Sequence, residues 1–236
     1  MPDTPRPWLV TPHDRIEKLE RNLWTVASRL PGRLPLPRRT TIARLGDGRL
    51  AFFDSFALDD ETLSALRAWG TPALQVVPNG RHRLEVGAVK ERLGLATYCP
   101  APEGRRVRAA VAVDGHLGDF PRDPDVRLEP LDGVRTGEPV MVVKSGGRTS
   151  LVFADAVMNF ERTGGLPGFV TGALGFGFGP KVAPVWKLLS LGDKGALRRH
   201  LERLADLPGL ARLVCCHGPV IGEGAAEVLR AVAARM

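Results

Sequence analysis

The sequence predicts one α/β domain that spans residues 1–236, and three observations predict it. The chain of 236 residues is long enough to bury a sizeable core within one unit. Its composition, 44% hydrophobic and 25% charged, is typical of a globular domain. Stretches rich in strand patterns are followed by helical patterns twice along the chain, without a repeat of solenoid length.

The first half predicts strands interrupted by helices. Strand patterns occupy residues 23–28, 40–55, 73–78 and 95–100. Gly46, Asp47 and Gly48 supply turn residues that divide the second of these into a hairpin. A helix capped by Asp59 or Asp60 is expected to end at Gly70, and another covers about residues 84–93. The sequence therefore predicts strand, helix and strand in succession.

The second half repeats this order after an irregular middle. Residues 106–115 alternate toward a hairpin-like turn at Asp114 and Gly115. Further elements are strands within 125–131, 139–160 and 212–220 and helices at about 194–207 and 224–235. Residues 163–186 contain seven glycines between Gly164 and Gly179, so we expect a mobile loop or a broken helix over one face.

Charge and cysteine content exclude several kinds of partner. The net charge of +7 comes from scattered arginines, with one tyrosine and no basic cluster among aromatics, which argues against nucleic acid. We expect no membrane partner, because no run of about 18 apolar residues exists. Cys99, Cys215 and Cys216 form no disulfide framework, and no signal-peptide pattern begins the chain. These features predict a cytoplasmic protein.

Three polar side chains, His82, Asp155 and His217, follow strongly apolar strands. An aspartate directly after residues 151–154 is expected to be desolvated, so it requires a cation, a metal ion or several donors. Two histidines and a carboxylate are suitable ligands for zinc. The sequence therefore indicates a polar site where these strands end.

Each of these residues also has a structural alternative. His82 can cap the helix that follows it, His217 can be a buried hydrogen-bonding residue, and Asp155 can accept backbone N–H groups. Cys216 can be considered as a nucleophile beside His217, but adjacent strand residues point to opposite faces.

Several segments together resemble the metallo-β-lactamase superfamily. They are strand-loop-helix at 73–94 with VVPNGRH, then SLVFADAVMNF, and finally CCHGPVIGEGAAEVLRA near the C-terminus. Their order and spacing are most similar to a bacterial branch whose members have largely lost the metal-binding motif. The resemblance covers nearly the whole chain and implies a four-layer αββα sandwich with a metal centre at one edge of its facing sheets.

The resemblance also assigns positions in the superfamily motif H-x-H-x-D-H. His82 falls on its last histidine, Arg81 on the aspartate and Asn79 on the second histidine. Asp155 matches the bridging aspartate and His217 the final histidine, and the position of a further histidine offers only Asp132. Because a guanidinium cannot ligate a metal, we expect Arg81 to stand in for the lost metal and to form a bidentate ion pair with Asp155 that balances the charge of a degenerate centre.

The sequence leaves three functional hypotheses. The first is a non-catalytic or small-molecule-binding protein, in which Asn79, Arg81 and Asp132 bind a small, anionic ligand. The second is a mononuclear hydrolase of an ester or lactone, with one divalent ion, zinc by preference, on His82, Asp155 and His217 and with Asp155 and His217 catalytic. The third is an interaction module, and a homo-oligomer, that uses Phe176 and Phe178 of the glycine-rich segment 163–181.

Overall fold

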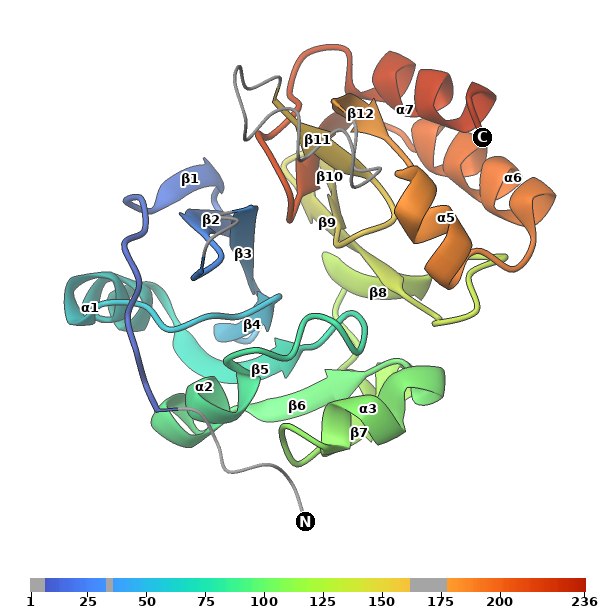
Figure 1. Ribbon diagram of the computed structural model, residues 1–236. Helices are drawn as coiled ribbons and strands as arrows, with labels where there is room; N and C mark the ends of the chain where they lie inside the picture. The colour runs from blue at the N-terminus through green and yellow to red at the C-terminus, as the bar shows by residue number, and fades with distance from the viewer. Residues whose placement is uncertain (1–6, 33–35, 162–177) are drawn as a thin grey trace.

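A computed structural model describes residues 7–32, 36–161 and 178–236 and contains two facing sheets (Figure 1). Within these residues the larger sheet has seven strands in the order β1-β2-β3-β4-β5-β6-β7. They are β1 (Glu17–Glu20), β2 (Leu23–Arg29), β3 (Pro37–Arg44), β4 (Arg49–Phe53), β5 (Thr71–Val76), β6 (Ala96–Cys99) and β7 (Gly115–His116).

The other sheet of the described chain has four strands in the order β13-β10-β9-β8. They are β8 (Val126–Pro130), β9 (Pro139–Ser145), β10 (Arg148–Phe153) and β13 (Leu210–Cys215). A separate two-stranded ribbon contains β11 (Met158–Phe160) and β12 (Gly179–Lys181). β4 pairs in parallel with β5, and β10 pairs in parallel with β13. Each parallel pair therefore places the C-terminal ends of its two strands at the same edge of the sheet.

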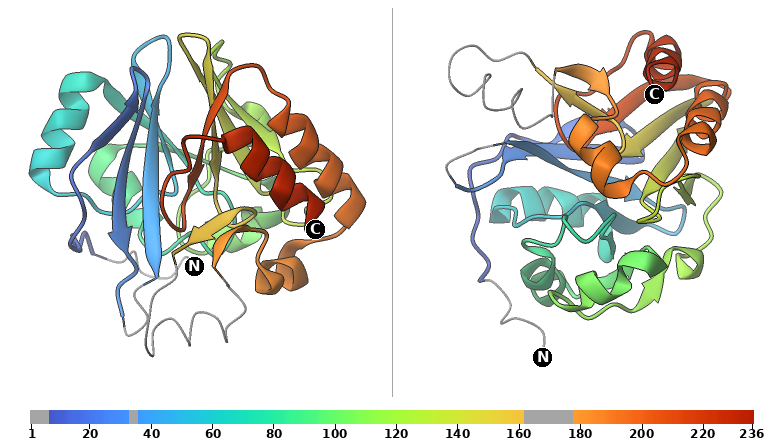
Figure 2. Two further views of the ribbon diagram at one scale, coloured as in Figure 1. Left: turned by 90° about the horizontal axis from the view of Figure 1, so that it is seen from above. Right: turned by 45° about the vertical axis from the view of Figure 1, so that its right-hand side comes forward.

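The described helices cover the outer faces of both sheets, as the left view of Figure 2 shows. They are α1 (Asp60–Trp69), α2 (Val86–Leu93), α3 (Gly104–Arg108), α5 (Pro184–Ser190), α6 (Lys194–Ala205) and α7 (Ala225–Ala234). α1 begins where Asp59 accepts the N–H of Thr62 and ends at Gly70, as its sequence predicts. α2 ends at Gly94, which has a left-handed backbone conformation.

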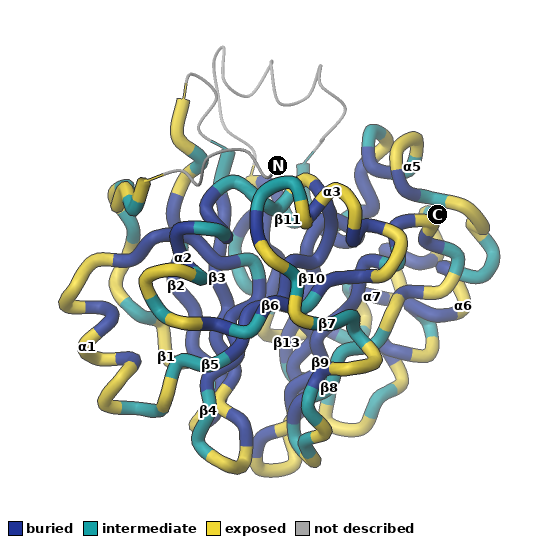
Figure 3. The backbone as a smooth tube through the Cα atoms, turned by 90° about the horizontal axis from the view of Figure 1, so that it is seen from below, coloured by how far each residue is buried: buried dark blue, intermediate teal, exposed yellow. Residues whose placement is uncertain are grey.

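Between the four layers, the described residues form three of their apolar cores. Phe53 and Val76 of the larger sheet pack with Met141 and Val152 of the smaller one, which fills the space between the sheets. A second core joins the larger sheet to α1 and α2, and a third joins the smaller sheet to α5, α6 and α7. Figure 3 shows that the buried backbone follows the strands, with exposed segments at the periphery. The four-layer αββα arrangement expected from the sequence is confirmed.

One sequence expectation is wrong, and another concerns residues outside the described part of the chain. The alternating stretch expected at 106–115, which leads to a hairpin-like turn at Asp114 and Gly115, is wrong, because it begins within α3 and places Val107 and Val111 four residues apart in one core. Residues 162–177 lie outside the described residues, so most of the glycine-rich segment and Phe176 are not placed. Phe178 is half-buried against the core beneath α5 to α7. No helix in the described part of the chain is long and apolar enough to cross a membrane.

Candidate functional site

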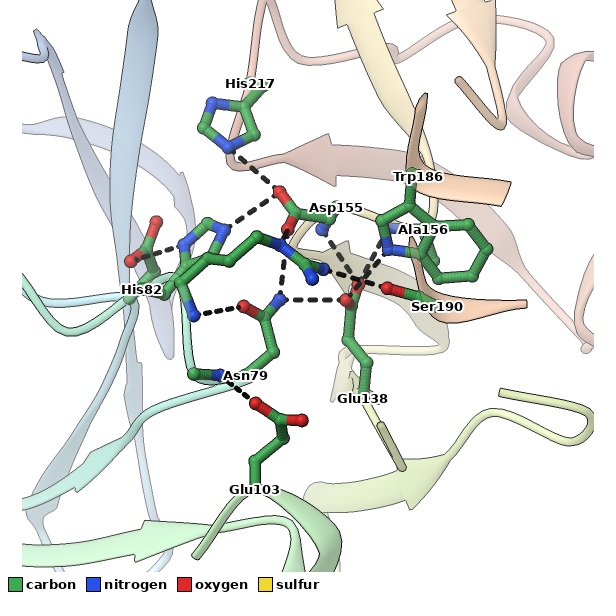
Figure 4. A network of polar contacts seen from close by, with 12 residues as sticks. Asn79, His82, Glu103, Glu138, Asp155, Ala156, Trp186, Ser190 and His217 are labelled. Carbon is green, nitrogen blue, oxygen red and sulfur yellow. Dashed lines mark hydrogen bonds and ion pairs between the residues drawn. The ribbon is translucent and has the colours of Figure 1, made fainter. Parts of the chain in front are cut away.

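Four polar side chains meet at the edge where the two sheets open: Asp54, His82, Asp155 and His217. Asp54 follows β4 and His82 lies in the loop after β5, whereas Asp155 and His217 follow β10 and β13. Figure 4 shows His82, Asp155 and His217 pointing toward one another. The parallel pairing of the strands therefore explains why residues far apart in sequence converge.

The Asp155 carboxylate lies at the centre of this group. Its Oδ1 is 2.9 Å from His82 Nε2 and 3.1 Å from His217 Nε2. Its Oδ2 accepts hydrogen bonds from Arg81 Nε at 3.0 Å and from Asn79 Nδ2 at 3.1 Å. One carboxylate oxygen thus faces both histidines, while the other is held by two donors.

Each histidine is oriented through its other ring nitrogen. His82 Nδ1 is 2.8 Å from Asp54 Oδ1, and His217 Nδ1 is 2.7 Å from the carbonyl oxygen of Pro37. Because a carboxylate and a carbonyl oxygen only accept hydrogen bonds, each Nδ1 carries a proton. In a neutral imidazole Nε2 then presents a lone pair toward Asp155 Oδ1. A cation is required between them, either a proton on each imidazole or a metal ion.

The backbone of Asp54 is held in an unusual conformation beside His82. Its φ of 58° is the only positive φ of a non-glycine residue in the described parts of the chain. Such a conformation costs about 1–3 kcal/mol and is found where the surrounding structure fixes it. Here Thr40 Oγ1 donates to the Asp54 carbonyl, and the Asp54 N–H donates to the Val76 carbonyl.

Asn79 fixes the loop that presents Arg81 and His82. This side chain is fully buried, and its Oδ1 accepts the Arg81 backbone N–H at 2.9 Å. Its Nδ2 donates to Glu138 Oε2 at 2.9 Å as well as to Asp155. All of its polar atoms are therefore engaged within the protein, and Asn79 positions its neighbours.

The same loop is anchored by Glu103 at Gly80. Glu103 Oε2 accepts the Gly80 N–H at 2.8 Å. A Cβ at position 80 would lie 2.3 Å from that oxygen, so the close approach requires glycine there.

Glu138 holds the backbone that carries Asp155. Its Oε1 accepts the N–H groups of Asp155 and Ala156 at 2.8 and 2.7 Å. Its Oε2 accepts from Asn79 Nδ2 and from Trp186 Nε1, the latter at 3.2 Å. Figure 4 shows these four donors around the one carboxylate. Glu138 is fully buried, and each contact uses it as an acceptor.

Burial and neighbouring charges shift the pKa values of Asp155, His82 and Glu138. Burial would raise the pKa of Asp155, but the charge of His82 and hydrogen bonds from both histidines hold it well below its usual value. Burial would lower the pKa of His82, but the charges of Asp54 and Asp155 hold it well above its usual value. Burial and the charge of Asp155 raise the pKa of Glu138 to about 7. Asp155 is therefore ionised, and His82 is cationic unless a metal ion replaces its proton.

A cavity of about 230 Å³ adjoins these residues. Its polar end is formed by Asp54, Arg81, His82, Asp155 and His217. Most of the remaining lining is apolar and includes Leu36, Phe56, Leu84, Met158, Phe160 and Leu189. Arg38 and Glu85 also line it, but they form an ion pair of 2.7 Å with each other. An apolar space with a few convergent polar groups is the usual form of a small-molecule site.

The donor set fits one metal ion. One ligand atom each from His82, Asp155 and His217 lies within 4.8 Å of the others. Imidazole nitrogen and carboxylate oxygen are ligands that zinc accepts, and three protein ligands leave a position open in catalytic sites. The outer atoms of all three side chains are held by partners, as is usual for metal ligands. Arg81 contributes no ligand and remains a fixed positive charge beside this set.

The structure therefore brings together most of the residues that the sequence singled out. His82, Asp155 and His217 converge, and Arg81 pairs with Asp155 as expected. The pair is not bidentate, because only Nε contacts Asp155 and Nη2 donates to Ser190. Asp132 lies elsewhere. Its carboxylate is 2.9 Å from His200 Nδ1 of α6, and it is not part of the cavity lining. The expectation that Asp132 reaches this site is wrong, because the turn after β8 directs it toward α6.

Sequence reasoning missed Asp54 and Glu138. Asp54 directly follows the apolar residues 50–53, which is the same pattern that drew attention to Asp155 after 151–154. The signal for Glu138 is weaker. A glutamate immediately before an apolar strand does not reveal which four donors surround it.

Comparisons with known proteins give results only at the level of three-dimensional structure. No protein-family model matches the chain. No curated protein matches it either. Among solved structures, the crystal structure of DIM-1 metallo-beta-lactamase exposed to ceftazidime is similar at a TM-score of 0.63 and 14% identity. That match covers 94% of this chain and 96% of the other.

Two further metallo-beta-lactamases give comparable matches. One is from Pontibacter korlensis, with a TM-score of 0.62, 11% identity, and coverage of 94% of this chain and 99% of the other. The other is TMB-1, with a TM-score of 0.63, 11% identity, and coverage of 96% and 99%. At these identities the likeness concerns the fold, and it extends over almost the whole of each chain.

Proposed function

We propose that this chain, which has the metallo-β-lactamase fold, holds one divalent cation and hydrolyses an ester or lactone of a small molecule in the adjoining cavity. The observation that carries the proposal is the arrangement around Asp155 Oδ1. Nε2 of His82 and Nε2 of His217 both face this oxygen. In a neutral imidazole the single N–H proton is on Nδ1, so neither Nε2 can donate a hydrogen bond to Asp155. A divalent ion between them satisfies all three groups at once.

The chain's own residues have distinct roles in this proposal. His82, Asp155 and His217 would hold the ion, and Asp54 keeps His82 in the tautomer that leaves Nε2 free. When bound, such an ion supplies a Lewis acid that polarises a carbonyl group and makes water more acidic. Arg81 fixes the second oxygen of Asp155, and the apolar walls limit the access of water.

The ion pair between Arg81 and Asp155 favours a second candidate, a site that binds a small molecule without catalysis. Without a metal ion, protonated His82 lies between the carboxylates of Asp54 and Asp155, and Arg81 adds a further positive charge at Asp155. Buried charges that are paired in this way are tolerated without a metal ion. The inherited cavity would then bind a small ligand.

Metal analysis of protein purified without chelator separates the two candidates. The hydrolase predicts about one equivalent of a divalent metal per chain, with zinc the first ion to test. His217→Ala should lose that metal. His116→Ala is the matched control, because His116 contacts the Cys99 carbonyl and lies outside the cluster. Hydrolysis of ester and lactone substrates should then fall together with metal content when a chelator is added.

The opposite outcome is equally clear. Protein without metal after incubation with excess zinc, together with a melting temperature that chelator leaves unchanged, would refute the hydrolase and support the binding site without catalysis. Metal that His217→Ala retains would show that the ion lies elsewhere.

A further inference from the structure

Arg81 has hydrogen-bond donors that its contacts within the protein do not use. A guanidinium has five N–H groups. Arg81 Nε donates to Asp155 Oδ2 at 3.0 Å, and Nη2 donates to Ser190 Oγ at 3.0 Å. Among the described residues the guanidinium makes no other hydrogen bond. Its side chain is 36% exposed and lines the cavity.

Three of the five N–H groups are unused. Asp155 takes Nε–H and Ser190 takes one N–H of Nη2, which leaves both N–H groups of Nη1 and one of Nη2. Nη1 and Nη2 form the forked end of the guanidinium, and arginine binds the two oxygens of a carboxylate in a bidentate manner. Because two of its nitrogens are already held, the guanidinium is preorganised.

The other arginine of the lining does not compete for a ligand. Arg38 is 6% exposed, and its Nη1 is 2.7 Å from Glu85 Oε1. Its Nη2 donates to Thr11 Oγ1, and its guanidinium lies over the ring of Phe56. The positive charge of Arg38 is therefore balanced by Glu85, and its guanidinium packs against Phe56 in the cavity wall.

The dimensions and walls of the cavity restrict the rest of the ligand. About 230 Å³ is below the roughly 300 Å³ at which sites for drug-sized molecules begin. Apolar side chains such as Leu36, Phe160 and Leu189 face this space. A compact body without further charge fits such walls, because each additional buried polar group requires its own partner.

We infer that Arg81 is an anion subsite and that the cavity takes a compact monocarboxylate with an apolar body. The carboxylate binds the Nη1 and Nη2 end of Arg81, and the body packs against the apolar walls. This inference rests on the proposed function only for its location, since Asp155 contacts both Arg81 and the two histidines. It goes further by naming the chemical class of the ligand and the residue that selects it.

Isothermal titration calorimetry with phenylacetate and its neutral isostere phenylacetamide tests the subsite. Phenylacetate should bind about tenfold to a hundredfold more tightly than phenylacetamide, as expected for a charge-assisted hydrogen-bonded pair. Arg81→Gln should remove that difference. Arg83→Gln is the matched control, because it removes the same charge from a side chain that binds the Arg106 carbonyl and does not line the cavity.

Two additional variants keep the test decisive if Arg81→Gln does not fold. Arg81→Lys retains the charge beside Asp155 but lacks the fork, so it should weaken phenylacetate binding with a smaller effect on the fold. Leu189→Ser changes a side chain that is 54% exposed, and it should weaken both ligands by a similar factor. Equal affinity of the wild type for the two ligands, or unchanged phenylacetate affinity in Arg81→Lys, would overturn the inference.

Metal content measured on the same samples separates this inference from the proposed function. Selective phenylacetate binding that depends on Arg81 in metal-free protein would support the subsite and refute the hydrolase. Protein with one bound metal but no preference for phenylacetate would refute the subsite and leave the hydrolase standing.

Discussion

Arg81 Nε lies 3.0 Å from Asp155 Oδ2, the carboxylate oxygen that neither histidine contacts. A guanidinium thus occupies the motif position at which the superfamily resemblance implies a metal-ligating aspartate. The exchange adds a permanent positive charge beside His82, Asp155 and His217, the group among the described residues that could hold a metal ion.

Asp54→Asn should weaken metal binding. Asparagine accepts a hydrogen bond from His82 Nδ1 and tolerates the left-handed backbone, so the change removes mainly the negative charge. Loss of such a partner lowers metal affinity by about 10–100-fold. Zinc titration against a competing chelator measures the effect. Asp60→Asn, at a largely exposed carboxylate, is the control and should match the wild type.

Glu138→Gln should destabilise the protein despite its similar shape. All four partners of Glu138 are donors, so a glutamine NH₂ group faces two of them in either orientation. Leaving buried donors unpaired costs about 1–3 kcal/mol each. Urea unfolding should therefore show a reduced midpoint. Glu91→Gln on the exposed face of α2 should leave it unchanged, and an equal midpoint for both variants would contradict this role of Glu138.

Asp59 should make the stability of α1 depend on pH. Hydrogen bonding to the Thr62 N–H holds the pKa of Asp59 below its usual 3.8. A lowered pKa stabilises the fold above the unfolded value, and this contribution is lost as pH falls through the folded value. The advantage of the wild type over Asp59→Asn should therefore be constant above about pH 5 and shrink below pH 4. Chemical unfolding at a series of pH values measures it.

The N-cap itself gives a companion result at neutral pH. Asp59→Ala should lose about 0.5–2 kcal/mol of stability, because Thr62 loses its acceptor. Asp59→Asn keeps that acceptor and should lose less. A reversed order would show that the charge of Asp59 matters more than its hydrogen bond.

Gly218→Ala should disturb the backbone beside His217. Gly218 has φ of 114°, and a Cβ there would lie 1.8 Å from the Asn159 carbonyl oxygen. A side chain cannot fit without moving that strand, so we expect a loss of more than about 1–3 kcal/mol, the range for backbone strain alone. Gly146→Ala is a suitable control, because Gly146 also has a positive φ but has open space around it. Thermal unfolding compares the two.

The cysteines should be unreactive in the native protein. Cys99, Cys215 and Cys216 are buried and unpaired, and burial raises the pKa of Cys215 to about 12. Because the thiolate is the reactive species, a thiol reagent at pH 8 should label none of them until denaturant is added. Rapid labelling of one thiol in folded protein would restore Cys216 as a candidate nucleophile.

Much of the fold could be predicted because each part has a local signal. The hairpin between β3 and β4 follows from the turn residues Gly46, Asp47 and Gly48, and α1 follows from Asp59 and Gly70. The stretch 106–115 is ambiguous in sequence, because Val107, Val111 and Val113 suit both an alternating strand and a helical turn. Its tertiary contacts with α2 and β6 decide between them.

The candidate site was predictable where a polar residue ends an apolar strand. That pattern identified His82, Asp155 and His217, and it would also have identified Asp54. Glu138 and Ser190 could not be found in this way, because their importance depends on donors from other strands and helices. Asp132 was misplaced because a loop position depends on a turn whose direction the sequence does not specify.

The strand-end residues of the site come in equal parts from two sheets that have no strand in common. Asp54 and His82 follow strands of one sheet, and Asp155 and His217 follow strands of the other. A metal ion or ligand that binds both pairs therefore also links the two sheets at the edge where they open. Occupancy should therefore slow amide hydrogen exchange along β4 and β10 alike, so that the sheets open as one unit and not separately.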